Sequence, residues 1–137
     1  MPESPQHLNT KDSTSLLTKV GEYLAAQGVG TLGTDIFLQV LPEEPVTGTA
    51  VVHTGGINLP GDPTRRPSLQ VLHRNVSAEA GLDKSVIIHR LLDDQWNVLT
   101  GFPGRLVAAS EPGSYFKDEA GLFSYSMNFV LVSTHQR

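Results

Sequence analysis

The histidines are the side chains of this chain best suited to metal binding or proton transfer, and there are five of them, His7, His53, His73, His89 and His135. No two have the close spacing of a His-Glu-x-x-His motif, in which both ligands share one helical face. Residues far apart in sequence can still meet in space. A small metal-dependent hydrolase built on His53, His73 and Asp94 is therefore one alternative, although the spacing favours ordinary surface or sheet histidines.

The carboxylates and hydroxyls give no clearer catalytic pattern. Asp93 and Asp94 are adjacent, and adjacent residues of a helix point about 100° apart, so they cannot act on one substrate atom. Ser124, Ser126 and Ser133 lack the Gly-x-Ser-x-Gly elbow that exposes a nucleophilic serine. We expect a solvated helix end and no active site, and hence no enzyme, no cofactor and no bound metal.

The stretch 28–33 matches G-x-G-x-x-G, which in a nucleotide-binding fold follows a strand and opens a helix. Here it follows a predicted helix and leads into a predicted strand, so no helix N-terminus is offered to a phosphate. We expect a helix end and a turn. Arg65 and Arg66 form a basic pair, but the net charge of -4 argues against a dedicated nucleic-acid binder. A solvated loop or a protein contact is the simpler interpretation of that pair.

The composition predicts one domain. A chain of 137 residues can bury most of its surface in a single core, and its 13 Gly and 9 Pro predict long loops around a small sheet. The absence of Cys excludes disulfides and thiolate metal sites. No apolar run approaches the ~20 residues that a membrane span needs. We expect a soluble protein, made and first used in a cytoplasm, with no membrane partner.

The N-terminal residues 1–12 are polar and lack apolar periodicity, which predicts a flexible tail before a single domain at 13–134. A first helix is expected from Asp12 or Ser13 to Gly28, because apolar residues recur at spacings of three and four. Its predicted buried face consists of Leu16, Leu17, Val20, Tyr23 and Leu24. A second helix is expected after Ser77 and as far as about Trp96.

Five strands are predicted from β-branched and alternating residues, at 36–41, 50–53, 69–74, 105–109 and 123–133. The first reads as a central strand that pairs with the second as a hairpin, and the last is long enough to cross the whole sheet. Loops are expected at 54–67 and 110–122. The order of elements favours an α+β fold, with a mainly antiparallel or mixed sheet of about five strands covered by two helices.

Three segments carry a resemblance to a known family: Leu-Ala-Ala-Gln-Gly-Val-Gly-Thr-Leu-Gly-Thr-Asp-Ile-Phe at 24–37, Thr54-Gly55-Gly56, and Arg66-Pro67-Ser68-Leu69-Gln70-Val71. They resemble the tailed-phage minor capsid proteins, and among these the tail terminator or head-to-tail joining proteins of long-tailed phages. The resemblance covers roughly residues 15–133. It rests on structural signatures, since this family has no active site to compare.

The resemblance implies a small virion subunit that closes into a sixfold ring on the end of the tail tube. Such a ring halts tube growth and offers a surface to the head. The implied partners are other copies of the chain in a homohexamer, the tail tube protein and a head connector or neck protein, with DNA passing through without specific binding. The implied location is the tail or neck of the virion, after assembly in the host cytoplasm. A head-completion or neck protein on the portal side is the alternative within the same class.

The two predicted loops are the expected contact surfaces of such a subunit, because loops can become ordered when a partner binds. The Thr-Gly-Gly segment and the Arg-Pro strand entry are the parts that can be matched to the family. We expect the interface to comprise Thr54, Gly55, Gly56, Arg65, Arg66, Pro67, Tyr115, Phe116 and Lys117.

Overall fold

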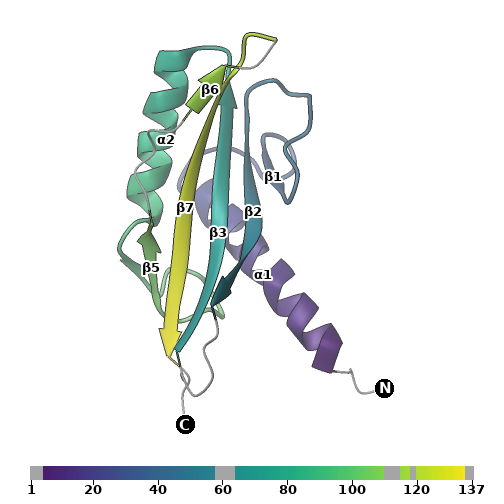
Figure 1. Cartoon of the computed structure of the whole chain (residues 1–137), viewed down its shortest axis with the longest axis vertical. Helices are drawn as coiled ribbons and strands as arrows, with labels where there is room; N and C mark the ends of the chain where they lie inside the picture. Colours follow the sequence, from purple (N-terminus) through teal and green to yellow (C-terminus); the bar gives the residue numbers. More distant parts are fainter. Residues whose placement is uncertain (1–4, 58–63, 110–114, 118–119, 135–137) are drawn as a thin grey trace.

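The computed structural model describes residues 5–57, 64–109, 115–117 and 120–134, with side chains described for 16–54, 67–109, 117 and 120–132. Two helices and seven strands lie in these ranges (Figure 1). In chain order they are α1 Pro5–Ala26, β1 Ile36–Leu38, β2 Gly48–Ile57, β3 Thr64–Asn75, α2 Ala78–Leu92, β4 Gln95–Trp96, β5 Arg105–Ala108, β6 Tyr115–Lys117 and β7 Phe123–Thr134.

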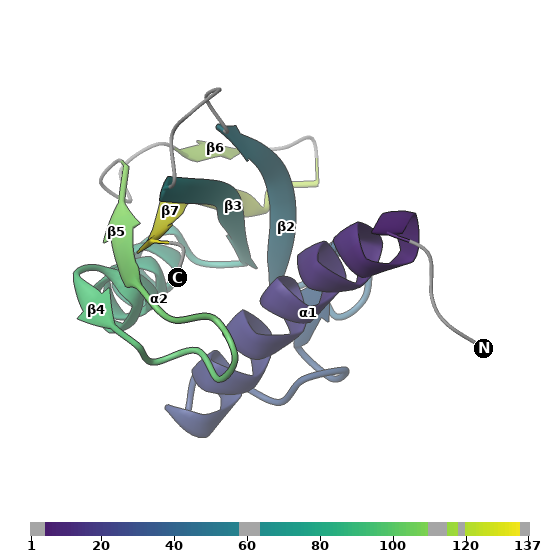
Figure 2. The ribbon, with the colours of Figure 1, turned by 90° about the horizontal axis from the view of Figure 1, so that it is seen from below.

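The strands form one mixed sheet in the order β1-β2-β3-β7-β5-β4, and β6 pairs with β7 beside this path. Only β1 and β2 run parallel among the described pairs. The sheet is curled, and both helices lie on the same side of it (Figure 2). The predicted α+β class is confirmed. Two short strands, β4 and β6, add to the five that the sequence predicts.

The core lies between the helices and the inner face of the central strands. Along β3, Val71 is opposite Val51 of β2 and Met127 of β7, and Leu69 is opposite Phe129. The side chains of these residues are fully buried. Because side chains alternate across a strand, this register places every second residue of β7 in the core. The long last strand predicted at 123–133 is confirmed, and it pairs with β3, β5 and β6.

Helix α1 buries Leu16, Leu17, Val20 and Leu24, which are members of the predicted apolar face. The helix ends where predicted: Gly28 has a positive φ of 87°, and the Val29 N–H donates to the Leu24 carbonyl. Its start was predicted at Asp12 or Ser13, which is wrong by about two turns. Proline fits the first helical turn, so Pro5 can begin the helix. The predicted flexible tail overlaps these turns, and residues 1–4 lie outside the described part.

Helix α2 begins after Ser77, whose Oγ accepts a hydrogen bond from the Ala80 N–H at 3.1 Å, as the sequence predicts for a capping residue. It ends at Leu92 and does not continue to Trp96. Asp94 and Asn97 have positive φ angles of 58° and 56°, which a helix cannot contain. The chain between them leaves the helix as β4 and pairs with β5.

The first strand is the main error in the predicted topology. β1 is a three-residue edge strand, parallel to β2, and neither a central strand nor half of a hairpin. Gln39 ends it early with a φ of 75°. The side-chain amide oxygen of Gln39 then accepts a hydrogen bond from the His53 N–H of β2 at 3.3 Å. The following loop returns along the sheet, so the next strand runs in the same direction as β1.

Candidate assembly surface

The Thr-Gly-Gly segment and the Arg-Pro segment form a paired ribbon, whereas the sequence predicted a loop at 54–67. In register, Gly55 is opposite Ser68, Gly56 opposite Pro67 and Ile57 opposite Arg66. The loop prediction is therefore wrong for 54–57 and 64–67, and residues 58–63 lie outside the described part. Glycines disfavour strands, but cross-strand pairing outweighs this weak preference here.

Thr54 lies at an irregularity of this ribbon. His53 is opposite Leu69 and Gly55 is opposite Ser68, so Thr54 is the extra residue of a β-bulge. Its exposed side chain shares a hydrogen bond of 2.9 Å between Thr54 Oγ1 and Ser68 Oγ. A bulge bends and twists the strand that contains it. The outer part of β2 is thereby turned relative to the part that covers the core.

The predicted second loop, 110–122, also contains a strand. Tyr115–Lys117 form β6, which pairs with Phe123–Tyr125 at the start of β7. The exposed Lys117 places its Nζ 5.6 Å from the centroid of the Phe123 ring. The loop prediction is wrong for these three residues, while 110–114 and 118–119 lie outside the described part.

The predicted interface residues fall into two groups at opposite ends of β7. Arg65 of β3 is opposite Ser133, near the last residue of β7, whereas Tyr115 of β6 is opposite Tyr125, near its first. Eight residues of strand separate Tyr125 from Ser133, which is about 26 Å at a rise of ~3.3 Å per residue. The Thr54 and Arg65 group and the Tyr115 group are therefore two separate surfaces.

His73 is a structural histidine of the core. Its Nδ1 lies 3.0 Å from Thr49 Oγ1, and its Nε2 lies 3.2 Å from Asn75 Nδ2. The amide oxygen of Asn75 accepts from the Ser77 N–H, so its NH₂ faces Nε2, which must be the unprotonated nitrogen. Nδ1 therefore carries the proton and donates to Thr49. Burial, assisted by the positive charge of Lys84, lowers the pKa of His73 to about 4.

The side chains of His89, Asp93 and Asp94 also contact neighbouring parts of the fold. His89 is buried on α2 with its ring centroid 6.0 Å from that of Phe129. Asp93 accepts a hydrogen bond from the Ala108 N–H at 2.8 Å, and Asp94 Oδ1 lies 2.7 Å from Arg105 Nε. The two aspartates at the predicted solvated helix end therefore connect the end of α2 to β5. Among the described residues, no group of three or more His, Asp or Glu side chains could hold a metal ion.

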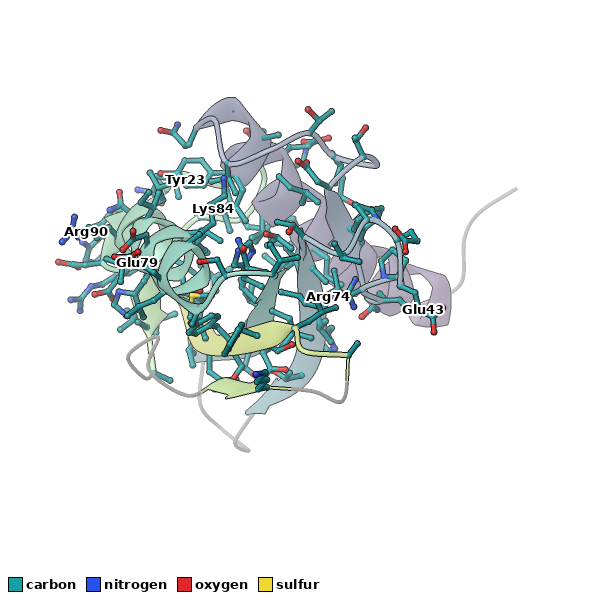
Figure 3. The ribbon with its side chains drawn as sticks, turned by 90° about the horizontal axis from the view of Figure 1, so that it is seen from above. Tyr23, Glu43, Arg74, Glu79, Lys84 and Arg90 are labelled. Atoms are coloured by element: carbon teal, nitrogen blue, oxygen red, sulfur yellow. The ribbon has the colours of Figure 1, made fainter. Side chains whose placement is uncertain are left out.

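Arg74 has a role that sequence reasoning missed. Its guanidinium donates to four backbone carbonyls of the loop between β1 and β2, those of Pro42, Glu43, Pro45 and Val46. The bonds to Val46, Pro45 and Glu43 measure 2.8, 3.0 and 3.2 Å. This loop is consequently fixed to β3, with Glu43 and Glu44 exposed. Figure 3 shows Arg74 and Glu43 on one side of the molecule and Arg90 on the other.

The family assignment follows from the sequence profile of the family described as "Bacteriophage tail terminator protein", which matches residues 23–134. The chain belongs to this family. The match covers most of the chain, including the ribbon and both groups of predicted interface residues. The resemblance inferred from the three sequence segments is confirmed. This tail terminator family member is a structural tail protein, and its place is in the phage particle.

One solved structure with the same fold is titled "Virion of native gene transfer agent (GTA) particle". A chain of that particle is 14% identical in sequence and superposes with a TM-score of 0.63, over 88% of this chain and 95% of the other. At this identity the similarity concerns the fold. No curated protein matches the sequence. Neither described helix is long and apolar enough to cross a lipid bilayer.

Proposed function

We propose that this tail terminator family member forms a homohexameric ring that caps the tail tube, stops its polymerisation and provides the surface to which the head is joined. The observation that carries the proposal is the family match over residues 23–134. The fold shared with a chain of a gene transfer agent virion agrees with a place in a virion assembly.

The position of the candidate surfaces on β7 supports a two-sided role. A subunit between a tail tube and a head connector needs contact surfaces at both ends of one rigid element. β7 has 12 residues, as many as β3, is paired on both edges, and has the ribbon at one end and β6 at the other. We infer that one of these ends faces the tube protein and the other faces the connector or neck protein.

The proposed role is structural and requires no catalysis. The polar residues that could have formed an active site, His73, Asp93 and Asp94, each stabilise a neighbouring element. DNA would pass through the ring without specific binding, and a chain of net charge -4 has little general attraction for phosphates. Assembly would take place in the host cytoplasm before the particle is released.

Deletion of the gene from its parent phage tests the proposal directly. We expect electron microscopy to show tails of abnormal or uncontrolled length beside unattached heads. Supplying the wild-type chain in trans should restore tail length and joining. Tails of normal length beside heads that fail to join would assign the protein to head completion on the portal side. Normal infectious particles would refute a structural role in assembly.

A further inference from the structure

The outer edge of β2 is covered along only part of its length. β1 pairs with residues 49–51, and the Val51 carbonyl also accepts a hydrogen bond from the Gln39 N–H. The side-chain oxygen of Gln39 then accepts from the His53 N–H at 3.3 Å. No strand of the described residues pairs with the same edge at 54–57. A row of strand backbone without a partner on one side is a template on which another strand can pair.

Gly56 directs its backbone groups toward this edge. The N–H and carbonyl groups of successive strand residues point alternately to the two sides, and those of Thr49 and Val51 point outward, to the segment 35–39. Both residues are opposite odd-numbered residues of β3, and Gly56 is opposite another of them, Pro67. The N–H and carbonyl of Gly56 therefore also point outward. The segment 54–57 contains neither a charged residue nor a proline, which commonly protect a free edge from pairing.

The far side of the sheet is closed at β5 and uncovered at β6. β4 pairs with the first two residues of β5, and the Asp93 carboxylate accepts from the Ala108 N–H at 2.8 Å. Tyr115–Lys117 of β6 pair with β7 on one side, and no strand in the part of the chain that the structure describes pairs with the other side. Figure 1 shows β2 and β6 on opposite sides of the β3–β7 pair.

Strand direction favours β6 as the partner of the β2 edge. β2, β3, β7 and β6 are each antiparallel to the strand before, so β6 runs opposite to β2. Side by side, β6 of one copy and β2 of another are therefore antiparallel, which is the more stable kind of pair. β4 is the alternative on that side, but it has two residues and runs in the same direction as β2.

We propose that residues 54–57 of one copy of this chain pair with Tyr115–Lys117 of the next copy, so that one sheet continues from copy to copy and closes into a barrel. The inference rests on the proposed function, which requires a ring. Two different edges make a heterologous contact, which closes into a ring when the rotation per subunit divides a full turn. Pairing of two β2 edges with each other would instead give a twofold dimer.

A closed barrel accounts for two features of the subunit. It leaves no open edge, so the uncovered sections of β2 and β6 both gain partners. The two sections also lie at opposite ends of β7. Joining them side by side inclines the strands to the axis of the ring, as the closing of any barrel requires.

Cross-linking tests the contact, because the chain contains no Cys. Thr54→Cys and Lys117→Cys each introduce one thiol at an exposed position, and a short bismaleimide joins thiols on adjacent strands. We expect the double variant to give a ladder of oligomers that ends in a closed ring, on tails from the complemented deletion phage and for the purified chain at high concentration. A mixture of the two single variants should give only heterodimers. Thr54→Cys with Glu22→Cys, on the exposed face of α1, is the matched control and should give no ladder.

Two cross-linking results would overturn the inference. One is a dimer formed by the Thr54→Cys chain alone in the yield of the mixture, which would mean that two β2 edges meet. The other is the absence of cross-linked oligomers from the double variant both in solution and on tails.

Proline substitution removes one hydrogen-bond donor from the same contact. Gly56→Pro deletes the N–H that points to the open edge, a position where an edge strand tolerates proline. We expect self-association, measured by analytical ultracentrifugation, to weaken by about tenfold or more. Gly56→Ala keeps the N–H and is the matched control, and circular dichroism verifies that both variants are folded. A folded Gly56→Pro chain that forms rings as readily as the Gly56→Ala chain would contradict the pairing.

The outcome also separates this inference from the proposed function. If the Gly56→Pro chain complements the deletion phage with normal tails and full titre, the strand pairing is wrong and the terminator role stands. If the deletion phage itself builds normal tails, the terminator role fails as well.

Discussion

Gly81 of α2 lies directly against the ring of Tyr125 of β7: a Cβ atom added at Gly81 would be 2.5 Å from Tyr125 Cε2. The hydroxyl of the same tyrosine donates to the Ala78 carbonyl, in the first turn of α2, at 2.5 Å. One tyrosine therefore sets both the distance and the position along the axis at which the helix packs on the sheet. Glycine is needed at position 81 because the Tyr125 ring leaves no room for a Cβ atom. The backbone conformation is not the reason, since Gly81 has no positive φ.

Replacing Gly81 by Ala should therefore destabilise the fold. Alanine gains about 1 kcal/mol of helix propensity over glycine, but overpacking a close contact costs typically about 1–3 kcal/mol and moves the helix away from β7. We expect a lower denaturation midpoint, measured by urea titration. Glu79→Ala, exposed in the same turn, should leave the midpoint nearly unchanged. A Gly81→Ala chain that is more stable than wild type would show that the helix has room at this contact.

Replacing Arg74 by Lys should release the loop between β1 and β2. Lysine keeps the charge but cannot present the planar set of donors that reaches four carbonyls, so most of these hydrogen bonds are lost. Hydrogen bonds from charged groups contribute about 1.5–3 kcal/mol each, and water replaces part of that, so a loss of roughly 2 kcal/mol is expected. Hydrogen exchange should quicken at 42–47 and remain slow in β7. Arg90→Lys, on an exposed arginine, is the control, and equal exchange in both variants would contradict the assigned role.

His73 should make the stability depend on pH. Its pKa is about 4 in the fold against an ordinary value near 6.5, because burial, and secondarily Lys84, disfavour the charged ring. A group whose pKa is depressed by folding contributes stability that is complete above pH 6.5 and lost as pH falls toward 4. At ~1.36 kcal/mol per pH unit, the largest loss is about 3 kcal/mol. Protonation would also set an N–H of the ring against the Asn75 NH₂.

Urea titrations from pH 7.5 to 4 measure this effect. The His73→Gln chain is expected to be less stable at neutral pH, because the contacts to Thr49 and Asn75 are altered, but its stability should fall less between pH 6.5 and 4. His53→Gln, on a half-buried histidine in the neighbouring strand, is the matched control and should keep the wild-type slope. Equal slopes for wild type and His73→Gln would contradict the assignment.

The helices and β7 could be predicted because their signals are local. Periodic apolar residues, such as Leu16 and Val20 in α1 or Met127 and Phe129 in β7, reveal a buried face whatever the partner is. Strand partners depend on distant residues. The parallel pairing of β1 follows from Gln39 and from the hydrogen bonds made by Arg74, and neither has a signature in the sequence around Ile36–Leu38.

The candidate interface also combines local features, which the sequence reveals, with strand pairings that depend on distant residues. The intrinsic preferences of Gly55, Gly56 and Pro67 predict a loop, yet these residues are paired as parts of long neighbouring strands. The register between β3 and β7 is interrupted at Arg66 and Pro67, as expected for a residue without an N–H to donate. Sequence reasoning placed the Thr54 and Pro67 segments in one loop and did not predict that they pair as strands. It could not show that Tyr115–Lys117 lie at the opposite end of β7, or that Trp96 is exposed.

Reversing the charges of Arg65 and Arg66 should impair assembly while leaving the subunit folded. Both residues belong to the end of β3, where backbone pairing with β2 and β7 is independent of their charge. If this end of β7 meets the tube or the connector, two added negative charges would repel an acidic partner surface or remove contacts to it. The Arg65→Glu, Arg66→Glu chain should give a wild-type circular dichroism spectrum but fail to restore tails in the deletion phage. Arg65→Gln with Arg66→Gln removes the charge without reversing it and should give a milder defect. Intact rings and infectious particles from the Arg65→Glu, Arg66→Glu chain would exclude this end of β3 from the assembly contacts.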